Sequence, residues 1–388
     1  MALPLKYTVR NVLVRRTRTA LTILGVALVA LVAGLMLAVT LGMVRSMKNS
    51  GSPDNVLLLS RKATTTMFSS IVPSDVAPLY SIQGLRTSDE NGEPYVSPEV
   101  FHGALVTFPG YPGLNEEKSA SVRGVTSAAF LVHEQVKMIS GEVSLDSETA
   151  VVGRLAYVRL GVPEDALAVG RTIRFGERNW KVVGVFAAPG TLMESEIWVD
   201  AGELQTTIRK KTYSTISLKL ENPALVQDVV QSLKKRTDVL YNAFSETEFY
   251  DEYAKTFVQM QRLAMLVTAI MAAGGLFIGL NTMFAAIRSR MQEVASLRVL
   301  GFRGRHILVA IVLESMFIAI AGGILACVAV WLFSGVPIRM SQRAFVVEFD
   351  VSVLLAMFAM TSAIGLLGGI IPAYHAIRVR VPDALRAG

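Results

Sequence analysis

The sequence predicts a helical membrane protein with four transmembrane helices and a large α+β extracytoplasmic domain. Of its 388 residues 52% are hydrophobic, and they gather in four blocks that are almost free of charge. A helix rises 1.5 Å per residue, so each block can cross a hydrocarbon layer about 30 Å thick. More than 200 residues of mixed composition separate the first two blocks. The blocks are Ala20–Val44, Leu263–Ile287, Ile307–Phe333 and Val353–Tyr374.

Basic residues mark one side of the membrane. Residues 1–19, the segment 288–306 and the tail 375–388 carry many arginines and few or no acidic residues, whereas segment 45–262 and the loop 334–352 are nearly balanced. The positive-inside rule places the basic pieces in the cytoplasm. We therefore expect a multi-pass protein of the bacterial inner membrane with both termini cytoplasmic. The net charge of +7 is explained by this topology, and no nucleic-acid-binding motif accompanies it.

The residues before the first span predict an amphipathic helix over 1–19. Leu5, Val9, Val12 and Leu13 recur at helical spacing with basic residues between them. Such a helix lies along the inner membrane surface, where anionic lipid attracts its basic face. It either sets the orientation only or also braces the moving parts.

The extracytoplasmic segment 45–248 predicts one domain with a smaller part inserted. NVLLLS, VSPEVFHGALVTF and KSASVRGV are strand candidates, and STISLKLENPALVQDVVQSLKKRTDVLYNAF returns as strand, helix and strand. Between them, residues 150–212 have a β-rich texture, with a hairpin expected where Gly-Glu-Arg forms a tight turn. We expect the returning unit to pair with the early strands, which makes 150–212 an inserted subdomain.

An aromatic stripe precedes the second span. Phe249, Tyr253, Phe257 and Met260 recur at steps of four, four and three residues, and no helix breaker separates them from the span. The pattern predicts a continuous stalk helix over 249–287 that projects beyond the membrane.

Four polar or small residues of the spans draw attention. Gly275 and Gly279 form a G-x-x-x-G pattern that permits close helix approach, either between two subunits or within one, and Asn281 follows one turn later. Glu314 is the charged residue inside the spans. Because it lies near the inner boundary, a carboxylate bonded to the segment 288–306 is favoured over a proton relay.

The segment between the second and third spans predicts a short amphipathic helix at about Gln292–Leu300. Val294, Leu297 and Leu300 recur at i, i+3 and i+6, and Gly301 is the residue type usual just past a helix end. A plain arginine-rich loop is the alternative, but topology alone requires neither the apolar stripe nor the glycine.

No catalytic or cofactor motif competes with this interpretation. The sequence holds no G-x-x-x-x-G-K-[ST], G-x-S-x-G or H-E-x-x-H pattern, and its four histidines are scattered. The single cysteine, Cys327, permits no intramolecular disulfide. We therefore expect no cofactor or metal site and no enzymatic activity of the chain itself.

Three stretches carry a family resemblance: GLNTMFAAIRSRMQEVASLRVLGFRGRHI, LKYTVRNVLVRRTRTALTILGV and IIPAYHAIRVRVPDALRAG. Together with AVVGRLAYVRLGVPEDALAVGRTIRFGERNWKVVGVF, they resemble the permeases of the MacB/FtsX class of ABC transporters. Val299 and Gln292–Glu293–Val294 depart slightly from the family pattern.

The resemblance implies a permease that works as a dimer, with itself or a close paralogue, above two ABC ATPase subunits that use ATP and Mg. It implies ATPase contacts through a coupling helix, here Arg290, Glu293, Val294, Leu297, Arg298, Leu300 and Gly301. Motion would then export or extract substrate, with a periplasmic adaptor and an outer-membrane channel as further partners left open. The alternative is an FtsX-like signalling subunit that activates a cell-wall hydrolase.

Overall fold

The computed structural model describes residues 16–63, 65–89, 92–143, 145–236, 240–255, 257–340, 343–346 and 350–379. The chain divides into two compact units, which we call the helical unit and the outer unit. The helical unit comprises Met1–Leu41, Gln259–Gly335 and Val347–Gly388, and the outer unit comprises Gly42–Val258 and Val336–Val346. The amphipathic helix predicted over 1–19 lies outside the described residues except for its last four, which begin the first long helix.

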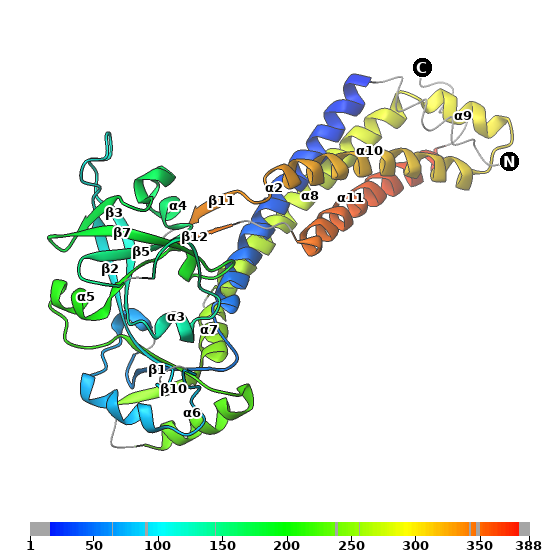
Figure 1. Cartoon of the computed structure of the whole chain (residues 1–388). Helices are drawn as coiled ribbons and strands as arrows, with labels where there is room; N and C mark the ends of the chain where they lie inside the picture. Colours follow the sequence, from blue (N-terminus) through cyan, green and yellow to red (C-terminus); the bar gives the residue numbers. More distant parts are fainter. Residues whose placement is uncertain are drawn as a thin grey trace. The chain divides into compact units, whose positions relative to one another are not determined.

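The helical unit contains the predicted spans (Figure 1). Within the described residues, four helices are long and apolar enough to cross a membrane. They are α2 (Arg16–Asn49), α8 (Val258–Arg288), α10 (Gly304–Leu332) and α11 (Val351–Arg378). A shorter helix, α9 (Met291–Val299), lies between α8 and α10 in the chain.

Glycines allow α10 and α11 to pack closely. A Cβ atom added at Gly365 would lie 2.5 Å from the Cβ of Ala319, and one added at Gly323 would lie 2.6 Å from Oγ1 of Thr361. Such distances are far below van der Waals contact, so only glycine fits at these two positions. The two helices therefore pack against each other at short range.

The predicted stalk is not one continuous helix. Helix α7 (Glu246–Lys255) ends before Phe257, which lies in a turn and donates its N–H to Ala254 O at 2.9 Å, and α8 begins at Val258. The prediction of an unbroken helix was therefore wrong. The aromatic stripe packs all the same, because the rings of Phe249 and Tyr253 are stacked and Tyr253 meets Phe257 edge-on.

These aromatic residues pack around the end of α2. Tyr253 and Phe257 pack against the buried Met47 and Ala254, within the outer unit. Met260, the last member of the predicted stripe, belongs to the helical unit and is exposed. The stripe thus covers the end of α2 where it enters the outer unit.

The outer unit is built on a ten-stranded mixed sheet. Its strand order is β10-β1-β9-β2-β3-β8-β5-β7-β4, and β6 pairs with β7. The strands are β1 (Asn55–Ser60), β2 (Val96–Val106), β3 (Lys118–Val125), β4 (Lys137–Gly141), β5 (Thr149–Gly153), β6 (Thr172–Phe175), β7 (Arg178–Ala187), β8 (Ile197–Asp200), β9 (Thr215–Lys219) and β10 (Tyr241–Ser245). The helices among them are α3 (Ala129–Val132), α4 (Ala156–Leu160), α5 (Ala201–Thr207) and α6 (Val226–Lys235).

Part of this sheet closes into a small barrel. Thr107, just after β2, exchanges two backbone hydrogen bonds of 2.9 Å with Arg174 of β6. Strands β2, β3, β8, β5, β7 and β6 therefore form a ring. Its interior is filled by one apolar cluster that includes Val122, Val152, Ile173, Trp180 and Val199.

The returning strand-helix-strand unit pairs as predicted. Strand β9 lies between β1 and β2, and β10 pairs with the other edge of β1. Helix α6 covers these strands with Val226, Val229, Val230 and Leu233, which all belong to the same apolar core. Asn222 opens the helical segment by accepting a hydrogen bond from Ala224 N.

The inserted part is larger than predicted. The barrel core already includes Val100 in the middle of β2 and Val122 of β3, so the insertion begins near residue 100 and not at 150. The sequence pattern does not reveal this early start because one strand, β2, contributes to two cores. Val96 belongs to the core covered by α6, and Val100 belongs to the barrel core. The hairpin of β6 and β7 forms as expected, with Gly176 and Glu177 both at positive φ in its turn.

The predicted outer loop 334–352 contains a two-stranded hairpin. Strand β11 (Pro337–Met340) pairs antiparallel with β12 (Arg343–Val346). The hairpin belongs to the outer unit, where it packs against α4 and against the short helical turn η5 (Met193–Ser195). The loop between two membrane helices is thus a docked element of the outer unit.

Candidate coupling site

Helix α9 has well-formed ends. Arg290 precedes it in a non-helical conformation, and its carbonyl accepts the hydrogen bond from Val294 N at 3.0 Å. After Leu300, Gly301 takes φ +90° and Phe302 N donates back to Leu297 O at 3.1 Å. This left-handed glycine stop matches the predicted position. The segment is therefore a defined helix and not a plain loop.

The predicted apolar stripe of α9 is divided between two faces. Val294 and Leu297, together with Met291, pack inward against buried residues of α8, α10 and α11. Leu300 points outward. The prediction that all three form one docking stripe was wrong, because a period of three residues drifts around a helix that has 3.6 residues per turn.

The first end of α9 is tied to α10 by a buried ion pair. Nη2 of Arg290 lies 2.8 Å from Oε1 and 2.9 Å from Oε2 of Glu314, and both side chains are largely buried. Glu314 is thus bonded to the segment between the spans, the arrangement favoured from the sequence. A charge of either sign would be costly here without its partner.

The second end of α9 is tied to α11. Nη1 of Arg298 donates to Ile377 O at 3.1 Å and to Val379 O at 2.9 Å. These carbonyls lie at the C-terminal end of a helix, where a cation is also favoured by the helix dipole. Arg298, which the resemblance assigns to the ATPase contact, caps α11 and is half-buried in the structure.

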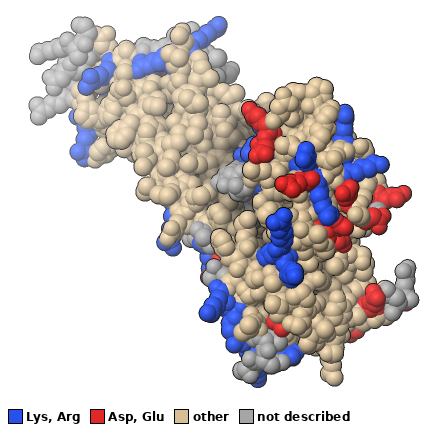
Figure 2. Space-filling view, turned by 90° about the vertical axis from the view of Figure 1, so that its left-hand side faces the viewer, with Lys and Arg blue, Asp and Glu red and all other residues tan. Residues whose placement is uncertain are grey.

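The exposed face of α9 is a different set of residues. Gln292, Glu293, Ser296, Val299 and Leu300 are exposed, and they recur at i, i+1, i+4, i+7 and i+8. Val299 is 67% exposed and Leu300 75%, which is unusual for adjacent apolar residues beside an arginine-rich segment. Figure 2 shows a broad band of uncharged residues over the helical unit, with Lys and Arg at one end of it. The α9 face offers a carboxylate beside an apolar pair.

The glycines of the second span pack within the subunit. A Cβ at Gly275 would lie 3.1 Å from Ile364 of α11 and 3.2 Å from Val29 of α2, and one at Gly279 would lie 3.8 Å from Ile364. Asn281 is exposed on another side of α8, level with Thr282, whose carbonyl accepts from Arg18 at 2.6 Å. Of the two readings left open by the sequence, the structure favours packing within one subunit for both glycines.

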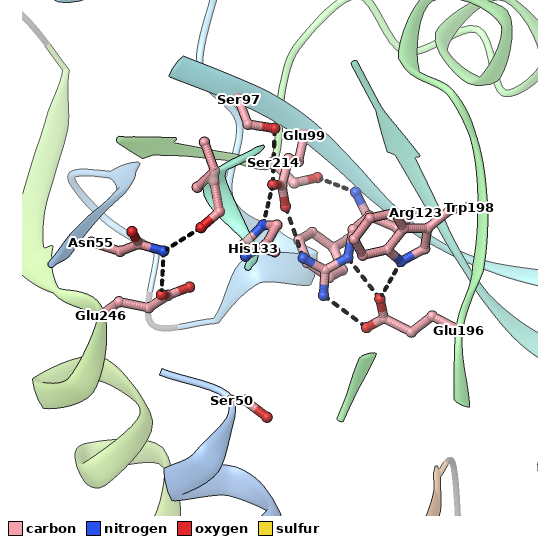
Figure 3. A network of polar contacts seen from close by, with 12 residues as sticks. Ser50, Asn55, Ser97, Glu99, Arg123, His133, Glu196, Trp198, Ser214 and Glu246 are labelled. Atoms are coloured by element: carbon pink, nitrogen blue, oxygen red, sulfur yellow. Dashed lines mark hydrogen bonds and ion pairs between the residues drawn. The ribbon is translucent and has the colours of Figure 1, made fainter. Parts of the chain in front are cut away.

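The outer unit contains a buried charged network that sequence patterns did not reveal. Arg123 of β3 lies between two carboxylates (Figure 3): Nη1 is 2.8 Å from Glu99, while Nε and Nη2 are 2.7 and 2.9 Å from Glu196. Nε2 of His133 lies 2.6 Å from Glu99, and Trp198 Nε1 donates to Glu196. We call Glu99, Arg123, His133, Glu196 and Trp198 the Arg123 network.

The charges of this network hold one another. Burial acts to raise the pKa of Glu99, but the facing His133 and Arg123 outweigh it and lower this pKa to about 2. Burial likewise acts to lower the pKa of Arg123, and the two carboxylates reverse that and raise it. Glu99 and Arg123 therefore stay charged inside the domain.

Another buried carboxylate, that of Glu246, joins the segments that lead toward the membrane helices. Oε2 of Glu246, the first residue of α7, accepts from Ser52 N at 3.0 Å and from Asn55 Nδ2 at 2.9 Å. Asn55 also donates to Val132 O, next to His133 (Figure 3). Burial raises the pKa of Glu246. The start of α7 is thus bonded to the connection between α2 and β1.

Comparison with known proteins assigns the chain to a family. The model of the MacB-like periplasmic core domain matches residues 19–236, and that of the FtsX-like permease C-terminal domain matches residues 265–381. A macrolide export ATP-binding/permease protein MacB of Haemophilus ducreyi is 22% identical over 316 residues, which cover 76% of this chain and 44% of the relative. MacB 2 of Aeromonas hydrophila is 24% identical over 326 residues, 79% of this chain and 49% of the relative.

The solved periplasmic region of MacB from Actinobacillus actinomycetemcomitans covers 54% of this chain and 95% of its own, with 14% identity and a TM-score of 0.39. The chain spans about half the length of the curated relatives named above. The two family models together cover the four predicted spans almost completely and most of the outer unit. The chain belongs to the MacB/FtsX-type family of ABC transporter permeases.

Proposed function

We propose that this chain is a permease subunit that transmits ATPase-driven motion to its extracytoplasmic domain, and so exports or extracts a substrate. The observation that carries the proposal is the construction of α9. Its inner face and both ends are fixed to α10 and α11, while its outer face remains open to a partner. A helix held in this way passes any displacement of its partner to the spans.

The partner that we propose is an ABC ATPase, in two copies that serve two copies of this chain. The curated relatives are named ATP-binding/permease proteins, and the present 388 residues contain no G-x-x-x-x-G-K-[ST] motif. The arginine-rich end of the helical unit would face the cytoplasm, with both termini on that side. Glu293, Val299 and Leu300 would enter a groove of the ATPase.

Extraction fits the spans better than passage through a channel. Within the four predicted spans Glu314 is the charged residue, and it is already paired with Arg290. A polar pathway through one subunit would require more polar groups than these helices contain. The large outer unit with its barrel is then the part that handles substrate.

Co-purification tests the proposal. The full chain is expressed with the ABC ATPase encoded nearest to its gene, and the bound ATPase is measured in detergent. We expect Val299→Glu with Leu300→Glu to reduce the bound ATPase at least tenfold, because two charges enter an apolar contact. Leu240→Glu is the matched control, since Leu240 is 71% exposed in the outer unit. Equal binding by the double variant would refute the α9 face, and no binding by the unaltered chain would refute the function.

A further inference from the structure

The hairpin of β11 and β12 connects the last two spans to the outer unit. Residues 333–336 join it to α10, and residues 347–350 join it to α11. Ala344 in β12 is only 2% exposed, so this strand is pressed against its neighbours in the outer unit. Arg339 of β11 reaches the end of α4, where its Nη1 would lie 2.9 Å from a Cβ at Gly161. The hairpin is therefore docked and does not hang as a free loop.

The two spans joined by the hairpin are packed against each other and bonded to α9. Gly323 and Gly365 bring α10 and α11 into close packing, as described above. Arg290 fixes the start of α9 to α10, and Arg298 fixes its end to α11. Close-packed interiors transmit displacement with little compliance. A movement of α9 is thus shared by both helices that hold the hairpin.

The chain connection through α8 is less direct. Phe257 interrupts the helix between α7 and α8, so displacement along this connection passes through a turn. A turn absorbs angular change at the cost of a few backbone torsions. A connection beside those through α2 and α8 would therefore affect how the outer unit follows the membrane helices.

The hairpin packs against η5, which directly precedes a residue of the Arg123 network in the sequence. Strand β12 packs against η5, which ends at Ser195, and the next residue is Glu196. Glu196 binds Arg123 through two hydrogen bonds, and Arg123 continues to Glu99 and His133 (Figure 3). The neighbouring Val132 carbonyl holds Asn55, which holds Glu246 at the start of α7. Buried polar contacts, joined by the chain at Ser195–Glu196 and at Val132–His133, thus connect the docking site of the hairpin to the start of α7.

We propose that the β11–β12 hairpin is a further mechanical connection beside α2 and α8, which carries motion of α9, α10 and α11 to the outer unit at α4 and η5. The Arg123 network joins this point to the start of α7, so that the hairpin and α7 act on one domain. This inference rests on the proposed function, because it names the route by which the same motion travels. Spatial continuity alone does not demonstrate coupling, so the test must measure motion.

The first experiment tests docking without any ATPase. In a Cys327→Ser background, Ala344→Cys and Val336→Cys are labelled separately with a membrane-impermeant maleimide on the full chain. Val336 is 43% exposed and Ala344 is 2% exposed, so we expect labelling at 344 to be at least tenfold slower. Equal rates would refute docking, whatever the fate of the proposed function.

The second experiment measures transmitted motion in the complex with the ATPase. A spin label at Asn179→Cys, an exposed position at the start of β7, reports the distance between two copies without nucleotide and after trapping with MgATP and vanadate. We expect this distance to change in the parent chain and in Val336→Asp, and the change to be lost in Ala344→Asp. Bound ATPase and basal ATP hydrolysis should be retained in all three.

A variant with lengthened links on both sides of the hairpin leaves the core of the outer unit unaltered. Six Gly-Ser residues inserted after Ser334 and six before Asp350 keep both strands and both spans but lengthen the links between them. We expect this variant to hydrolyse ATP without the distance change. A full change in it or in Ala344→Asp would overturn the proposal, and so would the absence of any change in a parent complex that still binds ATPase. Failure of the parent to bind ATPase would instead refute the proposed function.

Discussion

Arg290 meets Glu314 through a single guanidinium nitrogen, Nη2, which lies 2.8 and 2.9 Å from the two carboxylate oxygens. The same side chain also contacts the preceding helix α8, where Nε donates to Ala286 O at 3.4 Å. The ion pair therefore links the end of α8, the start of α9 and the middle of α10. A double-mutant cycle on Arg290 and Glu314 can therefore measure the strength of this link.

Removing one partner of this pair should cost more than removing both. We expect Glu314→Ala or Arg290→Ala alone to destabilise the full chain in detergent by on the order of 3 kcal/mol, because a buried charge is left unpaired. The double variant should lose less than the two single losses combined. Denaturant titration measures the cycle, and strictly additive losses would show that the two residues do not interact.

The two faces of α9 should respond oppositely to the same substitution. Leu297→Ala removes inward packing, so we expect a loss of about 1–3 kcal/mol in stability. Leu300→Ala lies on the exposed face, so we expect stability to change by less than about 0.5 kcal/mol while ATPase binding weakens. Thermal unfolding and co-purification are measured on both variants. The opposite result, a loss of stability in Leu300→Ala and weaker ATPase binding in Leu297→Ala, would support the single docking stripe predicted from the sequence.

Local patterns in the sequence were sufficient for most elements. Asp200 and Asn222 cap the helical segments that follow them, and Gly176 with Glu177 forms the turn of the predicted hairpin. The four spans follow from their length and lack of charge. Each of these signals lies within one element or at its edge, where the physical cause is also local.

Long-range pairings were not accessible in the same way. Arg123 binds Glu99 and Glu196 across 24 and 73 residues, and nothing in the spacing of three ordinary charged residues indicates such a pairing. Helical spacing identified Leu297 and Leu300 as apolar positions, but the direction that each faces depends on how α9 packs. Phe257 carries no breaker signal, so the interruption of the stalk is set by tertiary structure.

Crosslinking should separate the two sides of the second span. We expect Gly275→Cys in a Cys327→Ser background to give no crosslink between subunits, because Gly275 is buried against Ile364 and Val29. Cysteines at the exposed positions Ile270, Phe277 and Asn281 should include at least one that crosslinks two copies. Gly274→Cys is a control that faces open space beside the buried glycine. A crosslink at position 275 alone would show that the glycine pair lies at the interface between two subunits.

Acid should destabilise the outer unit through Glu99. Its pKa in the folded chain is about 2, below the ordinary value of 4.5, so its contribution to stability is complete above pH 4.5 and is lost as the pH falls toward 2. A difference of this size corresponds to about 3 kcal/mol. Glu246 acts in the opposite sense, because its raised pKa favours the folded state at low pH and that contribution fades as the pH rises.

Glu99→Gln should therefore be less stable than the parent at pH 7 and less sensitive to acid between pH 5 and pH 3. Thermal unfolding of the full chain over this range measures the effect, and Glu116→Gln is the control, since Glu116 is exposed and pairs with the nearby Lys118. An acid profile of Glu99→Gln that parallels the parent would show that the destabilising protonation occurs elsewhere. Removing Glu246 by Glu246→Gln should steepen the acid loss, because the opposing contribution is then absent.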